Sequence, residues 1–187
     1  GNRDLHPIYA EAQALDVPIT FHSAAGTYPP PAGSERFNNF FYTHSVGHPF
    51  EQMLAMASVV GEGILEIFPR LRVAFLEGGA GWVPFWAERL DEHYERRAEL
   101  VPRLTRPPGD YIRSGRVFVS CESEERILPA VLREIGESAV VYASDYPHWD
   151  CAFPNSMKNI ASRADLSESQ KRKILRENAL ALYRLSG

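Results

Sequence analysis

Four short apolar segments rich in β-branched residues recur along the chain, and segments with helical spacing alternate with them. The four apolar segments cover residues 17–22, 72–77, 116–121 and 140–144. Parallel strands need long crossover connections, which are usually helical. The alternation of strand and helix, repeated four times, therefore predicts an α/β fold with a parallel sheet and helical crossovers.

The segments between these strands carry helix signals. The spacing of apolar residues predicts helices over residues 7–16, 51–68, 84–100 and 124–135, and a last helix that runs to about residue 185. Ser123 is expected to cap the fourth helix, and Ser167 with Gln170 forms a capping box for the last. Residues 23–36 are predicted to form a long irregular loop, and loops of this length are usually functional. Residues 102–109 are predicted to form a linker. The aromatic segment 37–50 favours neither helix nor strand.

Groups capable of metal binding or proton transfer stand where three of the strands end. These groups are His22, Glu77 and Asp145, while the remaining strand ends on Cys121 and Glu122. The carboxyl ends of parallel strands share one edge of a sheet, where α/β folds place their chemistry. We therefore expect Asp145 to bind a metal or transfer a proton, and His22 and Glu77 to lie beside it.

Each of these residues also has a purely structural interpretation. A histidine at a strand end is more often structural than a ligand. Glu77 precedes a glycine-rich turn and could cap the next helix or pair with an arginine. Asp145 precedes Pro147 and could form an Asx turn. The pattern alone leaves a shared site and three separate structural roles equally open.

Aromatic and glycine residues surround these strand ends. Trp82, Tyr146 and Trp149 could form a rim suited to a flat organic substrate, although Trp82 fits the core equally well. The glycine-rich turn at residues 78–81 lacks the pattern of a phosphate-binding loop, so we interpret it as a sharp turn that lets the backbone approach a ligand. His44 and His48 could contact substrate or lie on the surface.

Composition excludes several classes of function. The net charge of −4, from 20 basic and 24 acidic residues, argues against a nucleic-acid surface. Two cysteines, Cys121 and Cys151, are too few for a disulfide framework and indicate a reducing, cytoplasmic compartment in which they pack inertly. No segment is apolar for long enough to cross a membrane. The 187 residues predict one domain, and the early first helix suggests a piece of a longer protein.

Four longer motifs resemble the amidohydrolase-related family that includes the aminocarboxymuconate-semialdehyde decarboxylases. They are PITFH at residues 18–22, FPRLRVAFLEGGAGWVP at 68–84, ASDYPH at 143–148 and ENALALY at 177–183. The resemblance implies a (β/α)₈ barrel with one divalent metal, usually zinc. It also implies that His22 is the metal histidine of the fifth strand and Asp145 the metal aspartate of the eighth.

Two departures from the family pattern bear on function. The metal-binding pair of the family's first strand has no counterpart here, so the chain is expected to cover strands 5–8. Many members carry a catalytic histidine where this sequence has Glu77, which could act as a base or as a metal ligand. Half a barrel leaves sheet edges unpaired, so we expect either an N-terminal half-barrel or a homo-oligomer.

These observations favour a metal-dependent hydrolase of small carboxylated or aromatic compounds. His22 and Asp145 are its predicted metal ligands, with zinc expected and manganese or iron possible. The predicted catalytic residues are Asp145 and Glu77. The residues predicted to contact the substrate are Trp82, Tyr146 and His148. The alternatives are a nonoxidative metal-dependent decarboxylase that uses the same metal and a truncated barrel that acts as a non-enzymatic binding module.

Overall fold

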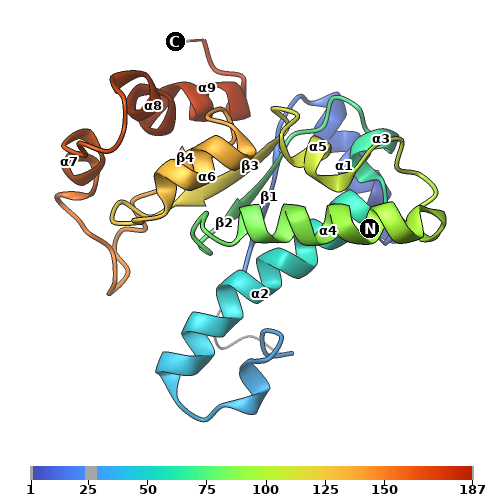
Figure 1. Ribbon diagram of the computed structural model, residues 1–187, viewed down its shortest axis with the longest axis horizontal. Helices are drawn as coiled ribbons and strands as arrows, with labels where there is room; N and C mark the ends of the chain where they lie inside the picture. The colour runs from blue at the N-terminus through green and yellow to red at the C-terminus, as the bar shows by residue number, and fades with distance from the viewer. Residues whose placement is uncertain (1, 24–28, 187) are drawn as a thin grey trace.

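The fold is built on a four-stranded parallel sheet, seen in a computed structural model that describes residues 2–23 and 29–186 (Figure 1). The strands are β1 (Ile19–His22), β2 (Val73–Leu76), β3 (Val117–Cys121) and β4 (Val140–Tyr142). They pair in sequence order, β1-β2-β3-β4, with Ile19 opposite Val73 and Val73 opposite Val117. The α/β fold with a parallel sheet is thus confirmed.

Helices connect the strands and cover the sheet. Before β2 lie α1 (His6–Ala14), α2 (Phe40–Gly61), α3 (Ile64–Ile67) and the 3₁₀ turns η1 (Arg3–Leu5) and η2 (Ser34–Arg36). Between β2 and β4 lie α4 (Val83–Arg97), η3 (Ala98–Leu100), α5 (Pro108–Ile112) and α6 (Leu128–Ile135). After β4 come α7 (Ser156–Ala161), α8 (Glu168–Arg172), the π-helical turn η4 (Lys173–Glu177) and α9 (Asn178–Tyr183).

Apolar side chains cover both faces of the sheet, as expected for parallel strands. Val73 and Phe75 of β2 belong to the main core, which the strands share with α2, α4, α5 and α6. The intervening Ala74 belongs to a smaller cluster on the other face, where Leu182 of α9 packs against Phe118. Helix α9 accordingly lies beside β4 in Figure 1, and the preceding turn η4 also contacts β4.

Several predicted boundaries are corrected. The helix expected over residues 51–68 begins at Phe40 and ends at Gly61, because Gly63 adopts a left-handed φ of 70° that starts α3 instead. Ser123 does not cap α6, whose first residue is Leu128. The linker expected at residues 102–109 runs into α5. The capping box of Ser167 and Gln170 is confirmed.

Buried Arg72 forms hydrogen bonds to α9, near the end of the chain, and to the segment that follows α1. Arg72 is only 3% exposed, and its Nε donates to the carbonyl of Leu182 over 2.7 Å. The same guanidinium donates to the side chain and the carbonyl of Asp16, both over 2.6 Å.

Cys121 is buried in the core as expected, and burial raises the pKa of its thiol to about 12. Within residues 2–23 and 29–186, no helix is both long and apolar enough to cross a bilayer.

Candidate metal and active site

The predicted site residues follow the strands at one edge of the sheet. His22 is the last residue of β1, Glu77 directly follows β2, and Asp145 lies three residues after β4. Glu77 and Asp145 have left-handed backbone conformations, with φ of 63° and 53°. Such conformations cost a residue with a Cβ about 1–2 kcal/mol. The chain therefore changes direction at Glu77, directly after β2, and at Asp145, three residues beyond β4.

Glu77 is the centre of the cluster. Its Oε2 contacts Nε2 of His22, and its Oε1 lies 3.5 Å from Nε2 of His48 and 3.9 Å from Nδ1 of His148. The side chain is 14% exposed. Its backbone N–H donates to Oγ of Ser120 on β3 over 2.9 Å, which fixes the turn after β2. The structure therefore brings Glu77 together with imidazoles from three separate segments of the chain.

Asp145 joins the cluster through His148. Its Oδ2 lies 3.3 Å from Nδ1 of His148, and its carbonyl accepts the His148 backbone N–H over 2.9 Å. One ligand atom from each of Glu77, Asp145 and His148 lies within 4.8 Å of the other two. His22 reaches this group through its contact with Glu77. Two of the three predicted residues, Glu77 and Asp145, thus lie together with His148, whereas His22 contacts Glu77 but belongs to neither group of neighbouring ligand atoms.

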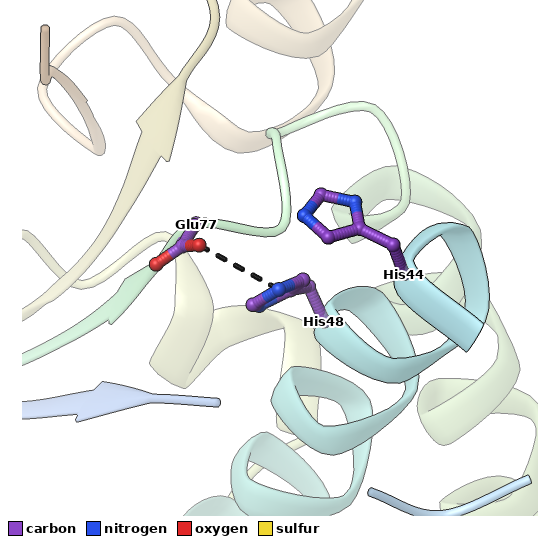
Figure 2. A group of neighbouring side chains, drawn as sticks. All are labelled: His44, His48 and Glu77. Atoms are coloured by element: carbon purple, nitrogen blue, oxygen red, sulfur yellow. Dashed lines mark ion pairs between the residues drawn. The ribbon is translucent and has the colours of Figure 1, made fainter. Parts of the chain in front are cut away.

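Two further histidines approach Glu77 from α2. His44 and His48 are one helical turn apart, and with Glu77 they form a second group whose ligand atoms lie within 4.8 Å of one another (Figure 2). Burial lowers the pKa of His48, which favours the neutral form of its imidazole. The i, i+4 spacing is visible in the sequence, but it places two rings on one face only if residues 40–48 form a helix.

Neighbouring polar side chains hold this edge of the sheet in place. Gln52 of α2 is 1% exposed, and its Nε2 donates to the carbonyls of Phe21 and Leu76 over 3.2 and 2.8 Å. The Glu125 carboxylate accepts the backbone N–H groups of Ala80 and Gly81 over 2.8 and 2.6 Å. The glycine-rich turn is therefore held by a carboxylate of this chain, which engages the backbone N–H groups of Ala80 and Gly81.

The predicted aromatic contacts occupy different surroundings. Trp82 packs against the main core and donates its indole N–H to the carbonyl of Gly79 over 2.9 Å. Tyr146 is 61% exposed and packs against Phe153, with ring centroids 4.4 Å apart. Trp149 is 73% exposed and packs against His44. Trp82 and Tyr146 therefore do not line a common cleft with Glu77 and Asp145. The ring of Trp149, by contrast, contacts that of His44.

A cleft of about 370 Å³ opens over the cluster, between α2 and the ends of β2 and β4. Carboxylates dominate its lining: Glu77, Glu122, Glu124, Glu125, Asp145 and Asp150. Burial and the neighbouring acids Glu125, Asp145 and Asp150 raise the pKa of Glu122 to about 7. Among the described residues that line the cleft, none is a lysine or arginine. The cleft therefore carries a concentrated negative potential that favours a cation.

The donor atoms of the cluster fit a divalent metal. Within the described parts of the chain, Nδ1 of His48 is buried and has no hydrogen-bond partner, whereas Oε2 of Glu77 contacts Nε2 of His22. Buried polar atoms normally find partners, so the His48 nitrogen is available to a bound ion. Carboxylates and neutral imidazoles are ligands of zinc, manganese and iron alike. The residues of the site can therefore bind a divalent metal, and their donor atoms suit zinc, manganese and iron equally.

Comparison with known proteins relates this chain to one protein family. Residues 1–185 match the amidohydrolase family Amidohydro_2. A 2-amino-3-carboxymuconate-6-semialdehyde decarboxylase of Dictyostelium discoideum is 30% identical over an alignment 183 residues long, which covers 94% of this chain and 47% of the relative. The chain thus spans about half the length of that enzyme.

Solved structures share the fold. The 5-carboxyvanillate decarboxylase of Sphingomonas paucimobilis superposes with a TM-score of 0.82 at 19% identity, over 99% of this chain and 54% of its own. A dihydroxybenzoic acid decarboxylase of Polaromonas sp. JS666, with bound manganese and an inhibitor, superposes with a TM-score of 0.75 at 20% identity, over 98% and 55%. The match of residues 1–185 to the family model shows that the chain belongs to the amidohydrolase family Amidohydro_2.

Proposed function

We propose that this chain is the metal-binding part of a nonoxidative decarboxylase of small aromatic or dienoic acids. Two observations support decarboxylation over the hydrolysis expected from the sequence. The relative that is 30% identical is a decarboxylase, and so are the structural neighbours described above. The observation that carries the proposal is the convergence of His22, Asp145 and His148 on Glu77 at the edge of the sheet.

The four strands correspond, in this proposal, to strands 5–8 of a (β/α)₈ barrel, and residues 1–187 form a single domain. The sheet ends at β1 and β4, each of which has one paired neighbour among the described strands. Unpaired strand edges are a liability that barrels remove by closure. An N-terminal half-barrel, or a second copy of the chain, would complete the structure.

His22, Asp145 and Glu77 would hold the divalent metal. Glu77 contacts His22 and lies with Asp145 in one group of ligand atoms. A bound ion would neutralise a substrate carboxylate and lower the pKa of a coordinated water. Zinc and manganese both suit imidazole with carboxylate ligands, and the Polaromonas relative carries manganese.

The residues of this chain supply the proton that decarboxylation needs. When the carbon–carboxylate bond breaks, carbon dioxide leaves and the electron pair stays on the substrate carbon, which must then take up one proton. Glu77 and His148 are in position to deliver it, since Oε1 of Glu77 lies 3.9 Å from Nδ1 of His148. His148 is half exposed and so can exchange its proton with solvent. Of the predicted aromatic contacts, the exposed Tyr146 would be free to meet the ring of a substrate, whereas Trp82 packs against the main core.

Release of carbon dioxide is the decisive assay. The protein that carries this chain, loaded with Mn²⁺ or Zn²⁺, is incubated with dihydroxybenzoic acids, 5-carboxyvanillate and 2-amino-3-carboxymuconate semialdehyde. We expect carbon dioxide and the decarboxylated product from at least one acid, with loss of activity in Asp145→Asn and full activity in His93→Gln, a control on the distant helix α4. Hydrolysis of amide or ester analogues without release of carbon dioxide would reject the proposal.

A further inference from the structure

The histidine face of α2 presents two imidazoles to the end of β2. His44 and His48 are four residues apart on the helix, and their ring centroids are 4.8 Å apart. His48 is 6% exposed, and its Nδ1 is buried without a hydrogen-bond partner among the described residues. A neutral polar ring buried in this way costs free energy unless something satisfies its nitrogen.

Glu77 completes a three-residue group with this face. Its Oε1 lies 3.5 Å from Nε2 of His48, and a ligand atom of each of His44, His48 and Glu77 lies within 4.8 Å of the others. Figure 2 shows both rings on the side of α2 that faces Glu77. Two histidines at i, i+4 on a helix with a carboxylate from another element give a donor set of the kind that holds zinc.

Packing alone explains only part of this arrangement. The ring of His44 packs against both Phe40 and Trp149, with centroid separations of 5.0 and 5.6 Å, so an aromatic role accounts for its position. It does not account for His48, whose buried Nδ1 has no partner in the part of the chain that the structure describes. The surrounding carboxylates Glu122 and Asp150 add negative charge, which favours a cation in the same cleft.

We propose that His44, His48 and Glu77 form a second divalent-metal site, separate from the one assigned to His22 and Asp145. Glu77 would be shared between the two ions, since its Oε2 contacts His22 and its Oε1 lies 3.5 Å from Nε2 of His48 and 3.9 Å from Nδ1 of His148. The paired imidazoles favour zinc, cobalt or nickel over magnesium or calcium. This site rests on the proposed function only through the shared Glu77.

Metal counting separates the two sites. The full chain is dialysed to equilibrium against Zn²⁺ alone, and bound zinc is measured by mass spectrometry in the wild type and in two variants. His44→Phe combined with His48→Asn keeps a ring beside Trp149 and removes the α2 nitrogens, whereas Asp145→Asn removes only the other site. We expect two ions in the wild type and one in each variant, with Zn²⁺ affinity at the α2 site weakened at least ~10-fold by either histidine change alone.

The outcomes are distinguishable. Equal zinc content in the wild type and the double histidine variant overturns the α2 site. One ion in the wild type that persists in Asp145→Asn and disappears in the double variant supports the α2 site and counts against the other. One ion in the wild type that persists in the double histidine variant and disappears in Asp145→Asn overturns the α2 site but leaves the proposed function intact. His93→Gln is the matched control, because His93 is exposed on α4, and it should bind as the wild type does.

Trp149 provides a second readout that needs no enzymatic activity. Its ring lies 5.6 Å from that of His44, so Co²⁺ bound there should quench its fluorescence. In Asp145→Asn, where only the α2 site remains, we expect saturable quenching that disappears on replacing Trp149 by Phe. Absence of quenching in a variant that circular dichroism shows to be folded would also overturn the α2 site.

Discussion

Replacing Gln52 by Met should weaken both the fold and the metal site of α2. The Gln52 amide nitrogen donates to the carbonyls of Phe21 and Leu76, at the ends of β1 and β2. Methionine has a similar length and no donor, so both carbonyls lose their partner. Leaving a buried polar group unpaired costs about 1–3 kcal/mol. The Oε1 of Gln52 has no partner in the described structure, and removing it returns about 1 kcal/mol.

The net effect is a loss of about 2 kcal/mol in the free energy of unfolding. Urea denaturation followed by circular dichroism measures it, and Gln13→Met is the control, because Gln13 forms an exposed hydrogen bond to the Arg70 N–H. We expect less than about 0.5 kcal/mol for the control. Since His48 lies one turn before Gln52, Co²⁺ affinity should fall with stability. A Gln52→Met protein as stable as the Gln13→Met protein would refute the argument.

Three further changes test the site. Asp145→Asn should abolish decarboxylation and cost less than about 1 kcal/mol of stability, because asparagine tolerates the left-handed backbone; an active variant would remove Asp145 from the mechanism. Glu77→Gln should lower turnover at least ~100-fold if Glu77 transfers the proton, whereas unchanged kcat would make it an architectural residue. Glu122 has a pKa raised from its usual 4.5 to about 7, so the folded protein binds that proton more tightly than the unfolded chain does. The metal-free protein should therefore lose stability as pH rises from 4.5 through 7, by about 1 kcal/mol given the solvent exposure of Glu122. Glu122→Gln should not show this loss in denaturation curves taken at pH 5 and pH 8, and identical pH dependence in both proteins would contradict the assignment.

The strands and their ends could be predicted from the sequence because both signals are local. An apolar run that stops at His22, or just before Glu77, indicates a buried strand and a side chain at its edge without knowledge of the rest of the fold. The capping box of Ser167 and Gln170 is local for the same reason. These signals sufficed for the parallel sheet and for the expectation that distant residues meet at one edge.

The histidine face of α2 could not be predicted in the same way. Residues 40–50 are aromatic, contain Gly47 and Pro49, and expose several large rings, so no apolar stripe indicates a helix. Its position depends on contacts far apart in sequence, such as those of Gln52 with Phe21 and Leu76. The role of Glu125, which fastens a turn more than forty residues earlier in the chain, is also nonlocal. Such pairings are fixed by tertiary structure alone.

The left-handed backbone at Glu77 and Asp145 implies that activity and robustness oppose each other at these two positions. Glycine would relieve the conformational cost at either one. Glycine would also leave no carboxylate at that position. A search for thermostable variants of this chain, run without selection for metal binding, should therefore enrich glycine at residues 77 and 145. The loss of function would be recorded as an improvement in melting temperature.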